Sequence, residues 1–346
     1  MSMASIVSLR YHAVKQGGPF ELVEVERPTP GPTELLINIR AVALNAVDWK
    51  QLETGHAVVS WPATFGNDGA GVVEAVGTGV DGFKRGDEVL ARFDPVNTAS
   101  AAFQGWAQNF AVISVNNVAP KPSHMSFEEA ASIPLGYMTA SSALYWALEI
   151  AFPFLKNGRG AGYEPKSVLV LGGSSSVGSA TIQLLRLALP NIVLISTSSP
   201  RHHAHLRSLG ATTTFDYTAP DIVHQIKRTS LGGQGVEAII DAVNGIYTRP
   251  ELLETLTGPK HFAEVVTGQM AREIPADVQH TLVFGRKVMT APGGSGIFSA
   301  LGELLTNGRY KIPLPVTVLG EGLELIEPGL RKLRAGVSGT KLVVKL

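Results

Sequence analysis

The sequence predicts an α/β protein that combines a small β-barrel or sandwich with a doubly wound parallel sheet. Short apolar runs separated by turn residues fill residues 1 to about 125, which is typical of a compact β domain. From residue 167 onward, strand and helix patterns alternate, and such βαβ units specify a parallel sheet with helices on both faces. Strand patterns return near the C-terminus, so we expect the last strands to complete the β domain.

The composition excludes several classes of protein. With 45% hydrophobic and 17% charged residues the chain is not mainly disordered, and 346 residues suffice for two domains of roughly 150 residues. Basic and acidic residues are equal in number, 29 of each, so no basic footprint favours nucleic acid or an anionic membrane. No uncharged apolar run reaches the ~20 residues that cross a bilayer, and the apolar start Met1–Leu9 is too short for a signal peptide. We therefore expect a cytoplasmic protein.

Cysteine is absent, which excludes disulfides, thiol nucleophiles and every cysteine-based zinc site. None of the nine histidines forms a close pair with a carboxylate at metal-ligand spacing. Three of them, His202, His203 and His205, lie on one predicted helix, where we expect them to face solvent or phosphate. The sequence therefore predicts a protein without a bound metal.

The first domain is expected to contain four strands, separated by segments rich in proline and glycine. The expected strands are Leu35–Ile39, Gly71–Val76, Glu88–Ala91 and Phe110–Ile113. The separators are Pro28–Pro32, Gly77–Gly79, Gly82–Asp87 and Asp94–Gly105. Helical patterning begins near Ser126, which forms a capping box with Glu129. We expect Pro134 to break that helix and Thr139–Ile150 to form another.

The second domain follows a connection rich in glycine and proline, Pro153–Pro165. Its expected strands are Ser167–Leu171, Ile192–Ser196, Thr213–Phe215, Val236–Asp241 and Phe262–Val266. Its expected helices are Val177–Ala188, Arg201–Leu209, Asp221–Thr229 and Pro250–Leu256, and the tail returns to strands at Val316–Leu319 and Leu342–Leu346. We therefore expect residues 1–125 and 300–346 to form the β domain and residues 126–299 to form the parallel-sheet domain.

The most informative segment is the small-residue turn from Gly172 to Gly178, which follows the first strand of the second domain. Backbone N–H groups at the start of a helix bind phosphate, and small residues let a pyrophosphate approach closely. Gly178 stands at the last glycine of the dinucleotide-binding pattern G-x-G-x-x-G, whereas Ser175 replaces the glycine three residues earlier. The turn indicates either a dinucleotide site or a purely structural connection between strand and helix.

The end of the next strand bears on the choice of cofactor. A free ribose 2′-hydroxyl usually meets an Asp or Glu there, about 20 residues beyond the turn. Here the strand runs into Ser199-Pro200-Arg201-His202 and contains no acid. The hydroxyls of Ser196–Ser199 and the charge of Arg201 suit a 2′-phosphate. We therefore expect NADP rather than NAD, the alternative being that Arg201 and His202 only cover an exposed helix start.

These features occur in a sequence that resembles the medium-chain dehydrogenase/reductase superfamily over nearly its whole length. Several segments are similar to its quinone-reductase branch: Ala43–Lys50, Gly66–Val73, Val80–Val89, Leu209–Ala211, Phe215–Tyr217 and Asp241–Gly245. The resemblance implies a GroES-like β-barrel domain and a Rossmann domain that binds a nicotinamide cofactor.

Within the superfamily, the chain resembles the fungal trans-acting enoyl reductases of polyketide pathways. The resemblance rests on the turn Gly173–Val177, on Ser199–His202, on Phe215–Tyr217 and on the ending Ser338–Val344. Zinc-dependent members of the superfamily polarise an alcohol with a metal that Cys and His usually hold. Here Asp48 stands near the position of the catalytic cysteine, and Asn67 and Asp68 stand near a His–Glu pair. The resemblance therefore implies a zinc-free member.

Zinc-free members reduce an activated double bond, with NADPH delivering hydride to the β-carbon of an enone or enoyl thioester. The resemblance implies that Val47, Asp48, Trp49 and Lys50 lie beside the nicotinamide, and that Lys50 and Thr139 are catalytic. Lys50 would order the cofactor ribose or stabilise the enolate, and Thr139 would bond the carboxamide or the substrate. Lys50 as a surface lysine and Thr139 as a helix N-cap are the alternatives.

The resemblance implies further contacts with the cofactor. The pyrophosphate would lie against Ser174, Ser175, Ser176 and Val177, and the 2′-phosphate against Ser199, Pro200, Arg201 and His202. The other contacts would be Tyr217 on the adenosine side, Thr267 and Gly268 on the nicotinamide side, and Val343 and Val344 from the C-terminus.

The substrate is expected in a cleft between the domains. Its lining would come from Thr139, Ala140, Ser141, Ser142, Ala143, Leu144, Tyr145 and Trp146, and from Gly285, Arg286, Lys287, Val288 and Met289. The two aromatic residues, Tyr145 and Trp146, fit a core position equally well.

Three functions stay open on the sequence alone. The first is an NADPH-dependent enoyl or quinone reductase, acting on a small molecule or on a carrier-protein-bound enoyl group supplied by a polyketide synthase. The second is a cofactor-binding protein without redox turnover, and the third is a zinc-free alcohol or ketone reductase. The chain is expected to be a monomer or a homodimer. Family members often dimerise through the last strand of the cofactor domain, expected here near Lys287–Ala291, but Pro292-Gly293-Gly294 then breaks that strand.

Overall fold

The computed structural model describes residues 7–93, 105–268, 270–271 and 273–346. Most of the expected apolar start Met1–Leu9 and of the separator Asp94–Gly105 lies outside the described residues. The chain divides into two compact units. The first comprises Met1–Pro134, Leu301–Thr306 and Pro315–Leu346, and the second comprises Leu135–Ala300 and Asn307–Leu314.

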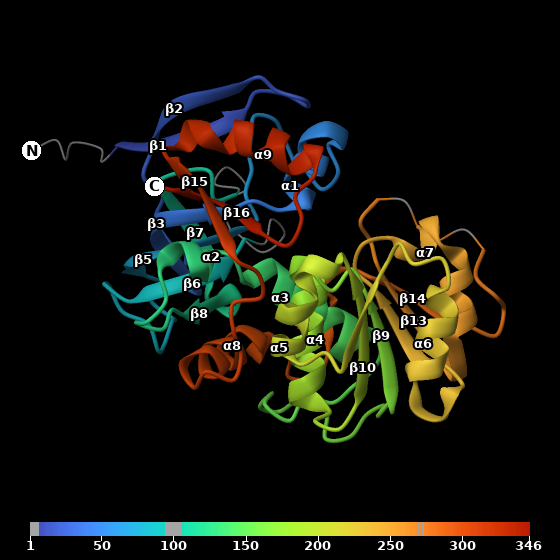
Figure 1. Cartoon of the computed structure of the whole chain (residues 1–346). Coiled ribbons are helices and arrows are strands. Elements are labelled where there is room, and N and C mark those ends of the chain that lie inside the picture. The colour runs from blue at the N-terminus through green and yellow to red at the C-terminus, as the bar shows by residue number, and fades with distance from the viewer. Residues whose placement is uncertain (1–6, 94–104, 269, 272) are drawn as a thin grey trace, which may run out of the picture. The chain divides into compact units, whose positions relative to one another are not determined.

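The first unit consists mainly of strands, which are coloured blue to green and red in Figure 1. They are β1 (Val7–Ala13), β2 (Phe20–Glu26), β3 (Glu34–Ala43), β4 (Ala63–Thr64), β5 (Asp68–Val76), β6 (Glu88–Arg92), β7 (Phe110–Ser114), β8 (Val118–Pro120), β15 (Val316–Glu321) and β16 (Lys341–Lys345). Its helices are α1 (Ala46–Thr54), α2 (Phe127–Ala131) and α9 (Ile326–Ala335).

β3 is the central strand of the first unit. It pairs antiparallel with β5, β7 and β16, within a sheet of order β15-β16-β3-β5-β6-β8. Leu35, Ile37 and Ile39 of β3 are buried in one apolar cluster with Trp106 and Val344. The last strand of the chain therefore lies in the first unit, as its sequence pattern predicts.

A second sheet of the first unit has the order β2-β1-β4. The sequence prediction missed β1 and β2. Glu21, Glu24 and Glu26 are exposed along β2, so an edge strand that faces solvent carries no continuous apolar signal.

The second unit is a parallel sheet with the order β11-β10-β9-β12-β13-β14. Its strands are β9 (Ser167–Leu171), β10 (Val193–Ser198), β11 (Thr213–Asp216), β12 (Val236–Asp241), β13 (Leu256–Val265) and β14 (Gln279–Val283). Its helices are α4 (Ser176–Ala188), α5 (His203–Leu209), α6 (Ile222–Thr229) and α7 (Gly245–Thr248), and α3 (Pro134–Ser141) and α8 (Ile297–Thr306) begin or end at the boundary.

The parallel sheet is doubly wound, as predicted. Figure 1 shows α4 and α5 on one face of the strands and α6 and α7 on the other. β9 is buried at every position, and a continuous apolar run is typical of a parallel strand covered on both faces. The strand order reverses between β9 and β12, and sheets of this kind bind ligands at that point, beyond the carboxyl ends of the strands.

The boundary of the first unit differs from the expected residue 125. The capping box of Ser126 and Glu129 is present at the start of α2, and α2 packs on β3 and β5. The helix that Ser126 caps ends at Ala131, before Pro134, as expected, and Pro134 begins α3, because the first position of a helix needs no N–H donor. The expected helix Thr139–Ile150 is the end of α3 followed by a π-helical turn, Ser142–Ala147. Thr139 is inside α3, so its alternative role as an N-cap is wrong.

The edge of the parallel sheet also differs from the prediction. Its last strand is β14, whereas Lys287–Ala291 begins within the 3₁₀ helix Gly285–Thr290. His280 and Thr281 occupy the middle of β14, so this strand lacks the apolar run that would have revealed it. The expected helix Pro250–Leu256 is a 3₁₀ helix, Pro250–Thr255.

Gly178, in the first turn of α4, packs against the turn that precedes the helix. A Cβ atom at this position would lie 2.2 Å from the carbonyl oxygen of Gly172. We expect Gly178→Ala to lower the free energy of unfolding by about 1–3 kcal/mol, the usual cost of overpacking. Urea unfolding followed by circular dichroism measures the change. Gly160→Ala is the matched control, because a Cβ there meets no atom within 4 Å, and an equal loss in both variants would contradict the prediction.

Candidate functional site

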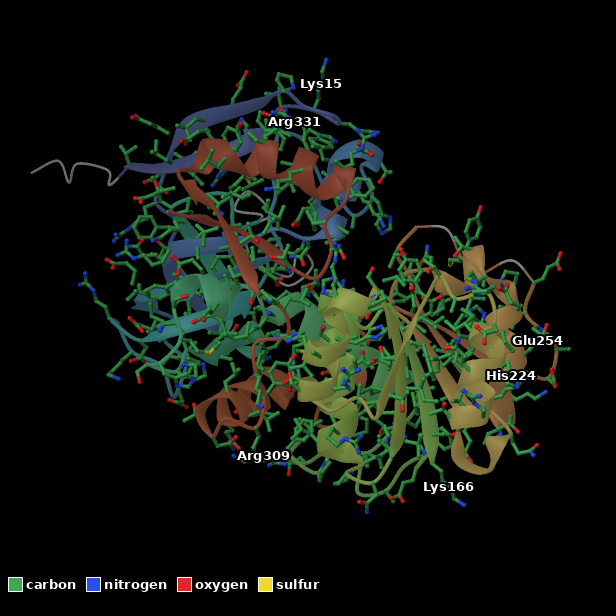
Figure 2. The ribbon with its side chains drawn as sticks, viewed as in Figure 1. Lys15, Lys166, His224, Glu254, Arg309 and Arg331 are labelled. Carbon is green, nitrogen blue, oxygen red and sulfur yellow. The ribbon has the colours of Figure 1, made fainter. Side chains whose placement is uncertain are left out.

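The candidate site of the second unit is the carboxyl edge of its parallel sheet. The turn Gly172–Ser175 follows β9, Ser199 follows β10, and Thr267 lies just beyond β13. Because the carboxyl ends of parallel strands share one edge, these three segments gather there. Lys166 directly precedes β9 and marks the opposite, amino edge of the sheet in Figure 2.

The start of α4 fits a phosphate group. Ser175 is the N-cap, and its hydroxyl oxygen accepts the N–H of Gly178 at 3.0 Å. The N–H groups of Ser176 and Val177 belong to the first turn and have no acceptor within the helix. The four predicted pyrophosphate contacts, Ser174, Ser175, Ser176 and Val177, are all half-buried. Serine at position 175 therefore caps the helix and leaves N–H groups and the positive end of the helix dipole for an anion.

The hydroxyls that end β10 bond to the neighbouring backbone. Ser196 is fully buried and donates to a carbonyl oxygen of β9 at 3.0 Å. The hydroxyl of Thr197 accepts a backbone N–H of the turn at 3.3 Å, and Ser198 donates to the carbonyl of Ser199 at 3.1 Å. Polar side chains in a buried strand commonly bond to the neighbouring backbone. A contact of the Ser196–Ser198 hydroxyls with a 2′-phosphate stays a prediction.

Arg201 and His202 form the 3₁₀ turn after Ser199, together with Pro200. Arg201 is exposed, and its Nε donates to Nε2 of His202 at 3.2 Å. Burial and the charge of Arg201 lower the pKa of His202 below its ordinary value of 6.5, which leaves the ring neutral at neutral pH. Arg201 therefore supplies positive charge that this turn presents to solvent.

Asp241 organises the segment after β12. Its buried carboxylate accepts the N–H groups of Val243, Gly245 and Ile246 at 2.9 to 3.0 Å. Burial raises the pKa of Asp241, and these hydrogen bonds oppose the rise. The segment holds Asn244 in the left-handed region at φ 59°, where its side-chain oxygen accepts the hydroxyl of Thr267. The structure thus joins a predicted nicotinamide contact to a residue that the prediction did not include.

Tyr217 directly follows β11 and is exposed. Arg249 donates to the carbonyl oxygens of Tyr217 and Ala219 at 2.7 and 3.0 Å, and its Nε pairs with Glu251 at 2.8 Å. Arg249 therefore holds the backbone that carries Tyr217. Nothing in the sequence marks a side chain that reaches a backbone 32 residues away.

The two segments predicted to line the substrate site lie together in the second unit. The hydroxyl of Ser142 donates to the carbonyl of Gly285 at 2.5 Å and accepts the N–H of Val288 at 2.9 Å. A Cβ atom on Gly285 would lie 2.7 Å from the Oγ1 atom of Thr139. Glycine at position 285 therefore leaves room for the Thr139 hydroxyl.

The aromatic residues of these segments occupy different surroundings. Tyr145 is fully buried, accepts the N–H of Arg159 at 2.5 Å and donates to the carbonyl of Pro292 at 2.7 Å. It therefore holds the core position that the sequence left open. Trp146 is half-buried, with the ammonium of Lys287 5.5 Å from its ring centroid. Other predicted lining residues are also buried, namely Ala140, Ser141, Ala143, Leu144 and Val288.

In the first unit, α1 carries the predicted nicotinamide contacts. Val47, Trp49 and Lys50 are half-buried, and the Lys50 ammonium lies 5.4 Å from the Trp49 ring centroid. Burial lowers the pKa of Lys50, so this lysine is not a fully solvated surface group. Val343 and Val344 are fully buried in β16, and Val344 belongs to the apolar core of the first unit.

Asp48, the fourth of those contacts, belongs to a buried polar group that we call the Lys341 cluster: Asn45, Asp48, Asn67, Asp68 and Lys341. Lys341 donates to Asn45 Oδ1 and lies 3.2 Å from the Asp68 carboxylate, to which the Asn45 side chain also donates at 2.9 Å. Asp48 accepts the backbone N–H of Asn45 at 2.7 Å and the side-chain amide of Asn67 at 2.6 Å. Burial raises the pKa of Asp48 to about 6, and its two hydrogen bonds oppose the rise.

The Lys341 cluster does not fit the zinc ion of the metal-dependent members. N–H donors point at both oxygens of Asp48, and an amide and an ammonium point at one oxygen of Asp68. These hydrogen bonds occupy carboxylate lone pairs that a metal ion would need for coordination. The cluster also contains neither a thiolate nor an imidazole ligand. No group of three or more His, Asp or Glu side chains that could hold a metal occurs within the described part of the chain.

A hollow lies beside the Lys341 cluster in the first unit. It is shallow, with a cavity volume of about 20 Å³, which is room for about one water molecule. Phe65 and Phe93 form apolar walls, and Gln51 and Asn67 provide amide groups. Asn67 thus belongs to both the cluster and the hollow.

Comparisons with known proteins place the chain among oxidoreductases. Residues 31–123 match the family described as the alcohol dehydrogenase GroES-like domain. The chain is 32% identical to dehydrogenase orf1 of Aspergillus niger, over 93% of this chain and 94% of that protein. It is 30% identical to trans-enoyl reductase tndF of Aspergillus flavipes, over 95% and 96% of the two chains. The crystal structure of CurK enoyl reductase matches with a TM-score of 0.76 and 25% identity, over 98% and 99% of the chains.

Among the residues that the structure describes, no helix combines the length and the apolar character needed to cross a bilayer.

The raised pKa of Asp48 predicts a pH-dependent contribution to stability. Between about pH 4 and about pH 6 the folded protein retains a proton on Asp48 that the unfolded chain, with a pKa near 3.8, has lost. The stability that Asp48 contributes therefore falls as the pH rises through this window. Asp48→Asn cannot titrate, so the free energy of unfolding of the unmutated protein should decrease relative to the variant from pH 4 to pH 6. Urea unfolding at intervals of half a pH unit measures this difference, and a difference that rises with pH would contradict it.

Proposed function

The chain belongs to the medium-chain dehydrogenase/reductase superfamily, and we propose that it is an NADPH-dependent reductase of α,β-unsaturated carbonyl compounds, in the manner of a trans-acting enoyl reductase. The observation that carries this proposal is the closed Lys341 cluster, which contains Asp48, Asn67 and Asp68, the residues that the resemblance places near the metal positions of zinc-dependent members. Reduction of a ketone or oxidation of an alcohol by those members needs a Lewis acid. Hydride addition to a β-carbon needs only stabilisation of the enolate that develops.

The choice of NADPH is supported by the segment after β10. No Asp or Glu follows this strand to bind a free ribose 2′-hydroxyl. Arg201 is exposed there, and its guanidinium suits a 2′-phosphate. The N–H groups of Ser176 and Val177 at the start of α4 would hold the pyrophosphate.

In this proposal NADPH supplies the hydride, and the side chains position the reactants and stabilise charge. Lys50 is a half-buried ammonium with a lowered pKa, which suits a group that meets a developing enolate. Thr139 is almost buried and keeps its hydroxyl beside Gly285, where it would bond the carboxamide or the substrate carbonyl.

The similarity to trans-enoyl reductases further suggests a place for this chain in cytoplasmic polyketide synthesis. In the proposed setting the enoyl group is bound to a carrier protein of a polyketide synthase, or is released from it as a small molecule. A stand-alone quinone reductase and a cofactor-binding protein without turnover are the outcomes that the kinetic experiment below distinguishes. Mass photometry decides between a monomer and a homodimer.

Arg201 is expected to determine the preference for NADPH. We expect NADPH to bind at least about tenfold more tightly than NADH, and Arg201→Ala to reduce this preference by ~1–3 kcal/mol, the scale of a charged hydrogen bond. Titration of both cofactors by intrinsic tryptophan fluorescence measures the preference. Arg228→Ala is the matched control, because Arg228 is an exposed arginine on α6. Equal affinities for the two cofactors in the unmutated protein would show that the assignment is wrong.

Lys50 and Thr139 are expected to act on turnover. Lys50→Ala and Thr139→Val should each lower kcat by ~10- to 1000-fold, the range for loss of one preorganised donor. The assay follows NADPH oxidation at 340 nm with an enoyl thioester, an enone and a quinone. Lys15→Ala is the matched control on the surface of the same unit as Lys50 (Figure 2).

The outcomes of this assay separate the proposed roles from the alternatives. If both variants turn over at the unmutated rate while they bind NADPH normally, the catalytic assignment is wrong. Turnover of quinones alone favours the quinone reductase. If the unmutated protein binds NADPH but reduces none of the three substrates, it is a cofactor-binding protein.

A further inference from the structure

Lys341 is a buried ammonium that the proposed chemistry does not use. Only 3% of Lys341 is exposed, and Asp68 and Asp48 are completely buried. Transferring an isolated charge of this kind out of water is very unfavourable unless it is paired and hydrogen-bonded. The ammonium satisfies this requirement through the Asp68 carboxylate at 3.2 Å and the side-chain oxygen of Asn45.

The partners of Lys341 connect it to the start of α1. Asn45 is the N-cap of α1, and its side-chain amide donates to Asp68 while its oxygen accepts from Lys341. Its backbone N–H donates to Asp48, the third residue of the helix, which completes a capping box. The backbone adds a further link, because the Leu44 N–H donates to the carbonyl oxygen of Leu342 at 2.9 Å. The first turn of α1 is thus fixed to β16 and β5 by charge and by hydrogen bonds.

We propose that Lys341 is the resident cation of this site: its ammonium, in place of a metal ion, compensates the buried carboxylates and positions α1. Lys50 lies one turn beyond Asn45 on α1, so the orientation of the N-cap determines where the Lys50 ammonium is held. Lys341 is therefore a positioning residue, which acts through Asn45 and Asp48. Its effect on kcat depends on the function proposed above, whereas its effect on stability does not.

Removal of the charge alone and removal of the charged pair have different consequences. Lys341→Met keeps most of the volume but leaves Asp68 buried without its cation. In the double variant Lys341→Met with Asp68→Asn, an amide replaces the carboxylate that lies nearest the ammonium, and Asn45 can still donate to the side-chain oxygen at position 68. Asp48 keeps its two N–H donors in this variant. Lys345→Met is the matched control on the same strand, because Lys345 is exposed and pairs with Glu128 at the surface.

The test measures kcat and KM for enoyl reduction, the midpoint of thermal unfolding and the zinc content of all four proteins. We expect Lys341→Met to lower kcat at least tenfold, with less than a threefold change in the KM for NADPH, and to lower the unfolding midpoint. The double variant should recover kcat to within about threefold of the unmutated protein and most of the midpoint, and Lys345→Met should leave kcat, KM and the midpoint unchanged. Zinc should be far below one ion per chain in all of them, and prolonged EDTA treatment should leave activity intact.

Two results would overturn the proposal. If the single and double variants lose kcat and thermal stability equally, the ammonium of Lys341 does not compensate the Asp68 carboxylate. If the unmutated protein contains one zinc ion per chain and loses activity when EDTA removes it, the metal is the cation of this site. Should the unmutated protein reduce no substrate, the proposed function fails by itself, and recovery of the unfolding midpoint in the double variant still decides whether Lys341 and Asp68 compensate each other.

Discussion

The pairing of β16 with β3 is the interaction on which the first unit depends. β3 is shared by three antiparallel partners, and the last of these, β16, is supplied by the final residues of the chain. The register that places Val343 opposite Ala43 also brings Lys341 to the end of β3, where the chain turns into α1. A strand pairing between residues about 300 positions apart therefore sets both the closure of the β sheet and the surroundings of the helix that carries Lys50.

The elements that were predicted well from the sequence are those whose structure is determined by residues close to one another in the chain. β9 lies at the centre of a parallel sheet, so its apolar run is continuous and visible without any knowledge of its neighbours. The Ser126 cap bonds an N–H three residues away, and so does Ser175 at the start of α4, which makes both helix starts visible in a short window. β2 and β14 are edge strands with a solvent-facing side, and their polar residues gave no such signal.

The candidate site was predictable where it depends on backbone and not predictable where it depends on distant side chains. The start of α4 presents N–H groups because every helix start does so, and small residues before it are a sequence signal. Arg249 and Lys341 have partners 32 and 273 to 296 residues away, and neither residue type indicates which oxygen it will meet. The hydrogen bonds that Ser196 and Thr197 make with the backbone of β9 and the turn beyond it were not predictable either, because the sequence does not show which backbone groups lie beside them.

The charged groups of the second unit are open to a ligand, whereas those of the Lys341 cluster in the first unit bind one another. This difference limits the reactions that the site can support. At the edge of the parallel sheet, the α4 start and Arg201 offer positive potential to an incoming anion, as a dinucleotide phosphate requires. In the first unit, Lys341 is already committed to Asp68 and Asn45, so the polar groups at the start of α1 are occupied with one another. Lys50 is the cation of α1 that stays half-buried outside this cluster, and burial has lowered its pKa. A partly desolvated ammonium interacts more strongly with a charge that develops during a reaction than a fully hydrated one does, because less water screens the pair. It also releases a proton more readily, so under the proposed function Lys50 would both stabilise the enolate oxygen and hold a proton within reach.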